Sequence, residues 1–317
     1  MISVPGPTLV RFPRFVGDAV MHLPILRLLR QQMYIWPIGV WGPAATLNLV
    51  ADREIGLVDF VIPETEKIGA IGLSKIIKNH NPDTTICFTK SLRPVIAARL
   101  ANVPERIGIS DSGAFMLNTH HAPFRKTNGH FILRYYNALK KRWPNIPAMP
   151  YADYQPTAQV EKPRTEYICL MPGSVWPSKA WPPEHYRELA DKARQSGLQI
   201  VILGTSSEAQ LGDYILNGRG LNLCGQTDLS QAAAWLHGAY GAIGNDSGLS
   251  HLAAACGTQT IAIFGPTDPQ ESAPWGQRVT VIKLQLKCSP CFKRKCPLPC
   301  RNCMMEITPR QVWDSLQ

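Results

Sequence analysis

The sequence predicts an α/β protein built from two doubly wound parallel sheets. Short apolar runs alternate with amphipathic segments along the whole chain, which is the pattern of successive β-α-β units. The chain has 317 residues, enough for two domains that each bury a core. A stretch with five prolines, residues 143–163, separates two halves that repeat this alternation. We therefore expect one domain at residues 1–160 and a second at residues 161–317.

The first half contains apolar runs of strand length and segments with apolar residues at helical spacing. Strands are predicted at residues 8–12, 38–41, 58–62, 84–88 and 106–109. Helices are predicted at residues 18–30, 71–79, 93–101 and 129–142.

The second half repeats the pattern with more regular spacing. Strands are predicted at residues 167–171, 199–203, 242–244, 260–264 and 279–282. Helices are predicted between or after them at residues 183–195, 209–216, 230–237 and 248–256. Because parallel sheets of this kind bind ligands beyond the carboxyl ends of their strands, the loops that follow the strands are the candidate sites.

The overall composition is that of an ordinary globular protein, with 45% hydrophobic and 18% charged residues. The most apolar early run, residues 19–29, is interrupted by His22, Pro24 and Arg27, which argues against an export signal and a membrane span. We therefore expect a cytoplasmic protein. Its nine cysteines are then better explained as thiols or metal ligands than as a disulfide framework.

The positive charge is concentrated in the first half. Through Val160 the chain has 18 basic and 10 acidic residues, whereas the remainder has 15 and 13. A basic face attracts phosphates, nucleic acid or anionic membranes, and charge alone does not choose among them. A solvated surface excess is the alternative explanation.

The most informative motif is Gly244-Asn-Asp-Ser-Gly-Leu-Ser-His251. Asp246, Ser247 and Gly248 lie between a short buried strand and a helix of small apolar residues. The free amides and the positive dipole at such a helix start favour an anion. The alternative is a plain helix cap, which uses the same residue types. A second loop, residues 265–268, follows the next strand and favours a ligand site.

Two other loops have the composition of binding loops. Residues 12–18 follow the opening strand and contain Gly17 and Asp18, and Asp18 is otherwise an ordinary first-turn acid. Residues 172–184 contain Gly173, Ser174 and Lys179 ahead of a proline-initiated helix. This loop can hold a phosphate although it lacks Walker spacing, and the alternative for its lysine is a solvated surface position. Neither half contains G-x-G-x-x-G, which argues against dinucleotide redox chemistry.

Five motifs follow one another along the chain: Val16-Gly-Asp18, Pro172-Gly-Ser with Lys179-x-Trp-Pro, residues 222–230, residues 246–251 and residues 264–269. Together they resemble glycosyltransferase family 9, the ADP-heptose:lipopolysaccharide heptosyltransferases. The resemblance runs from Leu9 to the final helix and keeps the family's order. The opening loop and the cysteine-bearing tail are closer to the heptosyltransferase II branch.

The resemblance implies a GT-B fold, in which two Rossmann-like domains face a cleft. The first domain would bind the acceptor, the inner core of lipopolysaccharide, which is anchored by lipid in the inner membrane. The second would bind the nucleotide sugar ADP-heptose. The final helix, residues 309–316, would pack back on the first domain. No cofactor would be required, and the protein would contact the cytoplasmic face of the inner membrane transiently.

The resemblance also gives roles to single residues. Asp18 would be the base that accepts the acceptor hydroxyl proton during an inverting displacement. Donor contacts would come from Ser174, Lys179 and the amides of Ser247 and Gly248. Asp246 would bind heptose hydroxyls or cap its helix, and His251 would reach the sugar phosphate or orient the Asp246 loop. Glu208 would bind the ribose, or else be a solvated first-turn acid. The candidate acceptor contacts are Arg11, Arg14, Lys90, Arg93, Arg125 and Lys126.

The tail supports a different class of function when it is considered alone. Cys288, Cys291, Cys296, Cys300 and Cys303 lie within 16 residues among basic side chains. Their spacing allows a structural zinc site, or a metal knuckle that grips nucleic acid. Reduced thiols in a compact loop are the default expectation, with no metal and no nucleic acid.

The other alternative to a heptosyltransferase is a GT-B enzyme that acts on a different nucleotide sugar, either as a transferase or as an epimerase.

Overall fold

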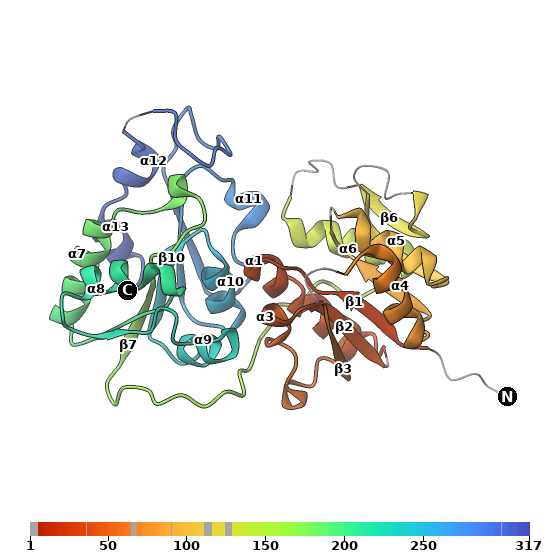
Figure 1. Ribbon diagram of the computed structural model, residues 1–317. Helices are drawn as coiled ribbons and strands as arrows, with labels where there is room; N and C mark the ends of the chain where they lie inside the picture. Colours follow the sequence, from red (N-terminus) through yellow and green to blue (C-terminus); the bar gives the residue numbers. More distant parts are fainter. Residues whose placement is uncertain are drawn as a thin grey trace. The chain divides into compact units, whose positions relative to one another are not determined.

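The computed structural model divides into two compact units, residues 1–150 (unit 1) and 151–317 (unit 2) (Figure 1). It describes residues 6–35, 37–64, 68–89, 91–110, 116–123, 129–298 and 300–317. Each unit is built on a six-stranded parallel sheet, so the predicted α/β fold is confirmed. The division falls after Pro150, ahead of the boundary predicted at Val160.

The strand order is the same in both sheets, β3-β2-β1-β4-β5-β6 in unit 1 and β12-β11-β10-β7-β8-β9 in unit 2. In each, the order reverses beside the unit's first strand, between β1 and β4 and between β7 and β10. These reversal points are where doubly wound sheets bind ligands.

The strands of unit 1 are Thr8–Arg11 (β1), Ile38–Pro43 (β2), Phe60–Glu64 (β3), Thr84–Cys87 (β4), Glu105–Ser110 (β5) and His120–Pro123 (β6). Its helices are Val16–Val20 (α1), Leu23–Arg27 (α2), Leu28–Gln32 (η1), Ala44–Leu47 (α3), Arg53–Ile55 (η2), Ala70–Asn79 (α4), Leu92–Leu100 (α5) and Phe131–Arg142 (α6).

The helix expected at residues 18–30 is broken in the structure. Pro24 lies at the start of α2 and has no N–H to bond the preceding turn, so α1 ends at Val20 and α2 begins at Leu23. The edge strand β6, His120-His-Ala-Pro123, was not predicted because it has no apolar or β-branched run.

The strands of unit 2 are Tyr167–Met171 (β7), Gln199–Ile202 (β8), Leu221–Asn222 (β9), Gly241–Asn245 (β10), Thr260–Phe264 (β11) and Val279–Lys283 (β12). Its helices are Pro177–Lys179 (η4), Pro183–Gln195 (α7), Ser206–Glu208 (η5), Ala209–Leu216 (α8), Leu229–Leu236 (α9), Gly248–Ala255 (α10), Pro269–Ser272 (α11), Asn302–Met305 (α12) and Pro309–Asp314 (α13).

The final helix belongs to the core of unit 2. Val312 and Leu316 are buried in the same cluster as Trp181 and Tyr186, and α13 packs beside α7 (Figure 1). A Cβ on Gly241 would overlap the Leu316 side chain, so β10 and the chain end lie in close contact. The expected packing of this helix on the first domain stays a prediction. Among the described residues, no helix combines the length and apolar character needed to cross a bilayer.

Candidate functional site

The predicted functional loops lie at the carboxyl ends of the central strands of both sheets. In unit 1, residues 12–18 follow β1. In unit 2, residues 172–179 follow β7 and residues 246–248 follow β10. Since β7 and β10 are paired, the two unit 2 loops leave the sheet side by side at its reversal point.

Asp246 is the centre of the unit 2 site. It is buried, and its Oδ2 accepts hydrogen bonds from Lys179 Nζ at 2.6 Å and from Thr267 Oγ1 at 2.7 Å. Lys179 Nζ also lies 4.7 Å from the centre of the Trp176 ring. A buried carboxylate paired with one cation and one hydroxyl holds three loops together, those after β7, β10 and β11. We name this group the Asp246 cluster.

Asp246 is not the residue that caps α10. The N-cap is Ser247, and it makes no side-chain cap hydrogen bond. The first amides of α10, beginning with Gly248, therefore keep the donor capacity that an anion can use. His251 lies one turn further along, is 6% exposed, and donates its backbone N–H to Ser247. Its role toward a ligand stays a prediction.

Asn245 holds the Lys179 loop in place, and sequence reasoning missed this role. It is fully buried at the end of β10, where its Nδ2 donates to Pro172 O at 2.7 Å and its Oδ1 accepts from Trp181 N at 3.0 Å. Ser250 Oγ donates to its backbone carbonyl at 2.7 Å. Asn245 thus fixes both ends of the Lys179 loop against β10. The signal in the sequence was a single side-chain amide, that of Asn245, at the end of an apolar strand.

Thr267 was also missed as an individual residue, although its loop was predicted to border the site. Its side chain is buried and bonds Asp246 directly. The loop could be located because β11 is paired with β10. The choice of Thr267 within that loop needed side-chain geometry.

Ser174 and Glu208 shape the loop after β7. Ser174 Oγ donates to Trp176 O at 3.0 Å. Glu208 closes a capping box, in which its Oε2 accepts from Thr205 N at 2.6 Å. A Cβ on Gly173 would overlap the Glu208 carboxylate, so this acid lies against the same loop. The predicted ribose contact stays a prediction.

Asp18 lies in the first turn of α1 and is half-buried. Its backbone carbonyl accepts a hydrogen bond from His22 Nδ1 at 2.8 Å, which requires the tautomer with Nδ1 protonated. His22 is fully buried among the rings of Phe12, Phe88 and Tyr135. Burial lowers the pKa of His22 to about 4. The turn that bears Asp18 is therefore supported by a neutral imidazole.

The Asp18 carboxylate affects the pKa of a neighbouring tyrosine. Burial raises the pKa of Tyr135, and the negative charge of Asp18 raises it further. Asp18 is thus close to a phenol that stays protonated. Its role as a base stays a prediction, supported by its position after β1.

The predicted acceptor cations fall into three groups. Arg11 is buried and bonds Glu64 Oε2 at 3.1 Å, Trp41 O at 3.2 Å and Phe12 O. Arg93 bonds the same Glu64 oxygen at 2.8 Å. Arg14 is exposed in the loop after β1. Lys90, Arg125 and Lys126 lie outside the described residues. Arg11 and Arg93 therefore have structural partners, and their contact with an acceptor stays a prediction.

The cysteine tail has free thiols. Burial raises the pKa of Cys303, and the thiols of Cys296, Cys288 and Cys291 raise it further, so each of these three thiols lies near Cys303. Cys300 is exposed. Within the part of the chain that the structure describes, no three His, Cys, Asp or Glu side chains form a metal-binding group.

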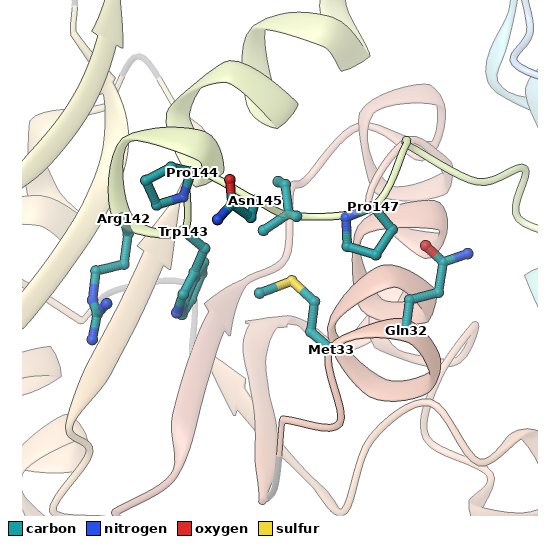
Figure 2. A pocket seen from close by; sticks show the side chains of 8 residues that line it. Gln32, Met33, Arg142, Trp143, Pro144, Asn145 and Pro147 are labelled. Atoms are coloured by element: carbon teal, nitrogen blue, oxygen red, sulfur yellow. The ribbon is translucent and has the colours of Figure 1, made fainter.

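A separate hollow of about 520 Å³ lies in unit 1 (Figure 2). Its walls include Met33 and Trp143. Met33 lies in the segment that leads from η1 into the amino end of β2. The neighbouring Arg142 bonds Glu105, the first residue of β5. This hollow therefore lies at the amino ends of the strands, opposite the edge where doubly wound sheets bind ligands.

Comparisons with known proteins agree with the predicted resemblance. The family model for glycosyltransferase family 9 (heptosyltransferase) matches residues 71–301. The chain is 25% identical to lipopolysaccharide heptosyltransferase 2 of Escherichia coli, covering 97% of both chains. It is 26% identical to lipooligosaccharide heptosyltransferase 2 of Haemophilus influenzae, covering 86% of this chain and 87% of that one. The solved structure of E. coli ADP-heptose lps heptosyltransferase II superposes with a TM-score of 0.79 at 25% identity, covering 98% of this chain and 97% of that one.

Proposed function

Because the chain belongs to glycosyltransferase family 9, we propose that it transfers heptose from ADP-heptose to the inner core of lipopolysaccharide. The Asp246 cluster carries this proposal. It joins a lysine, a carboxylate and an uncapped helix start at the carboxyl edge of one sheet. The full-length similarity to heptosyltransferases 2 supports the choice of sugar and acceptor.

Unit 2 would bind the donor. The diphosphate of ADP-heptose would lie against Lys179 Nζ and the first amides of α10, where positive charge and free N–H groups coincide. These donors are already in place when ADP leaves with its growing negative charge, which lowers the barrier to departure. Asp246 would keep Lys179 oriented and accept hydrogen bonds from heptose hydroxyls.

Unit 1 would bind the acceptor and supply the base. The Asp18 carboxylate would remove the proton from the attacking hydroxyl as the bond to the anomeric carbon forms. Direct displacement inverts the configuration of that carbon. No metal or other cofactor takes part in this scheme, because lysine and helix amides neutralise the leaving diphosphate. Cations such as the exposed Arg14 would bind the carboxylates and phosphates of the acceptor.

The protein would work in the cytoplasm, in transient contact with the inner membrane, because its acceptor is anchored there by lipid. The concentration of basic residues in the first half would favour that contact with an anionic surface. Nucleic acid has no part in this proposal.

The test is an assay of heptose transfer to heptose-deficient lipopolysaccharide, in which the ADP released is measured. We expect wild-type protein to react with ADP-heptose, and Asp18→Asn to lower kcat by about 10²–10⁴-fold while the Kd for ADP is unchanged. An unchanged melting temperature would show that the variant is folded. Turnover with another nucleotide sugar and none with ADP-heptose would overturn the proposal in favour of a different GT-B enzyme.

A further inference from the structure

The segment that contains four of the clustered cysteines, residues 288–298 and 300–301, contacts the loop that bears Lys179. We name it the cysteine segment. Ser178 Oγ donates to Lys293 O at 2.6 Å, and Ser178 N donates to Arg294 O at 3.2 Å. Arg301 Nη1 donates to Pro177 O at 2.9 Å. Ser178 is 3% exposed, so its hydroxyl bond is shielded from water.

The same segment also contacts the loop that bears Thr267. Ser289 Oγ donates to Gly265 O at 2.6 Å. The backbone amides of Cys291 and Phe292 donate to Pro266 O at 3.0 and 2.8 Å. Two loops that are far apart in the sequence are therefore bonded to one short segment, which lies near α12 (Figure 1).

The bonded positions are next to the side chains that meet at Asp246. Ser178 precedes Lys179, and Pro266 precedes Thr267. Lys179 and Thr267 bond the same oxygen, Asp246 Oδ2. From this arrangement we infer that the cysteine segment is a clamp that positions the donor site, with Ser178 and Ser289 as its two anchors. The inference rests on the proposed function and names a positioning role that the reaction scheme does not include.

Local structure alone does not fix the Lys179 loop. The helix η4 is a single turn of three residues with no side-chain cap, and a lysine side chain is long and flexible. Holding the backbone at Ser178 limits where the ammonium group can go. The segment also brings Arg294, whose guanidinium lies 5.6 Å from the Trp176 ring that Lys179 contacts on its way to Asp246. The clamp therefore orders the cations before the diphosphate arrives.

The test compares Ser178→Ala, Ser289→Ala and the double variant with Thr258→Val. Thr258 is the matched control, because its buried hydroxyl also donates to a backbone carbonyl, Leu236 O at 2.7 Å, away from the Asp246 cluster. Calorimetry would give the Kd for ADP. We expect Ser178→Ala to weaken ADP binding about tenfold, Ser289→Ala by less, and Thr258→Val by under about twofold. The KM for ADP-heptose should rise in parallel while kcat changes by less than about threefold.

The double variant tests the clamp as one unit. Because both anchors restrain the same segment, loss of either one loosens it, and the double variant should lose less affinity than the product of the two single losses. Fully multiplicative losses would mean two independent contacts and would overturn the inference. An ADP affinity of both serine variants equal to that of Thr258→Val would also overturn it.

A measurement without ligand separates this inference from the proposed function. Ser289 does not bond η4, yet Ser289→Ala should speed hydrogen exchange at the amides of residues 178–180 if the segment transmits the restraint. Unchanged exchange there would overturn the clamp even if heptose transfer is confirmed. Conversely, faster exchange in a protein that does not turn over ADP-heptose would leave the clamp standing and reject the proposed function.

Discussion

Units 1 and 2 share one strand order and use the ends of their strands differently. In unit 2, Lys179 and Thr267 converge on the Asp246 carboxylate. In unit 1, the carboxylate of Glu64 at the end of β3 joins Arg11 and Arg93. The unit 2 cluster balances one cation with one anion, whereas Glu64 faces two guanidinium groups. A common topology therefore supports a charge-balanced cluster in unit 2 and a cluster with one excess positive charge in unit 1.

The comparison separates the cluster that we propose serves donor binding from the cluster that supports the fold. The Asp246 cluster connects three loops at the reversal point of its sheet. The Glu64 cluster braces β1 against β3 and α5, while Asp18 lies on the separate turn that His22 supports. We therefore expect changes in the Asp246 cluster to alter donor binding and changes in the Glu64 cluster to alter stability.

The largest expected effect follows the loss of Lys179. Lys179→Ala removes the cation that we propose faces the diphosphate, and it leaves buried Asp246 with its hydrogen bond from Thr267. We expect kcat/KM for ADP-heptose to fall about 10²–10³-fold, as for other removed transition-state donors. Lys192→Ala is the matched control, because Lys192 forms a more exposed pair with Glu188 at 3.8 Å. Equal activity in the two variants would contradict a donor role for Lys179.

Loss of Glu64 should act on stability instead. Glu64→Gln removes the charge that compensates buried Arg11 and partly exposed Arg93. Breaking a buried pair typically costs about 3–5 kcal/mol, and the exposure of Arg93 places the expected loss near the lower end. Urea unfolding would measure it. The Kd for ADP should be unchanged, and a large change in that Kd would erase the distinction between the two clusters.

The buried His22 predicts a pH dependence of stability in unit 1. Burial lowers the pKa of His22 to about 4 in the folded protein, whereas the pKa of a histidine in an unfolded chain is about 6.5. Between these values the unfolded chain binds a proton that the folded chain excludes, so the free energy of unfolding falls as pH is lowered through this window. The expected contribution is about 2 kcal/mol between pH 7 and pH 5.

Substitution by a ring that does not titrate isolates this effect. His22→Phe should lack the histidine contribution, although it loses the hydrogen bond to Asp18 O at every pH. Urea unfolding of both proteins at pH 7 and pH 5 would compare them. The same pH dependence in the variant as in the wild type would mean that His22 does not titrate in this way.

The smallest expected effect follows the loss of the Thr267 hydroxyl. Thr267→Val keeps the shape of the side chain and removes one of the two hydrogen bonds to Asp246 Oδ2, while Lys179 remains. We expect the KM for ADP-heptose to rise about three- to tenfold with little change in kcat. Steady-state kinetics of Thr267→Val and of the control Thr258→Val would show whether the effect is specific to Thr267. A matching rise in the control would mean that Thr267 has no special role.

Most strands and helices could be predicted because their signal is local. The ranges of α7 and α8 agree with their apolar spacing, and β11 agrees with its apolar run. The two-residue strand β9, Leu221–Asn222, could not be predicted because it is too short to have a period. The location of Asp246, Lys179 and Asp18 was predictable from strand ends, since parallel strands bring their carboxyl ends to one edge.

The partners of these residues could not be predicted from sequence. Glu64, Arg11 and Arg93 meet only after the sheet forms, and nothing local marks Glu64 as their common anion. The cysteine segment contacts the Lys179 and Thr267 loops through backbone carbonyls and amides, which residue types do not reveal. From spacing, the tail was expected to be a loop of reduced thiols with a metal site as the alternative, and its contacts with the Lys179 and Thr267 loops could not be foreseen.

The measurement that tests the central claim most directly is a crystal structure with ADP-heptose bound. We predict that its diphosphate lies against Lys179 Nζ and the first amides of α10, with heptose hydroxyls on Asp246. A nucleotide bound instead at the Glu64 cluster of unit 1, with the Lys179–Asp246 pair undisturbed, would contradict the division of roles between the two units.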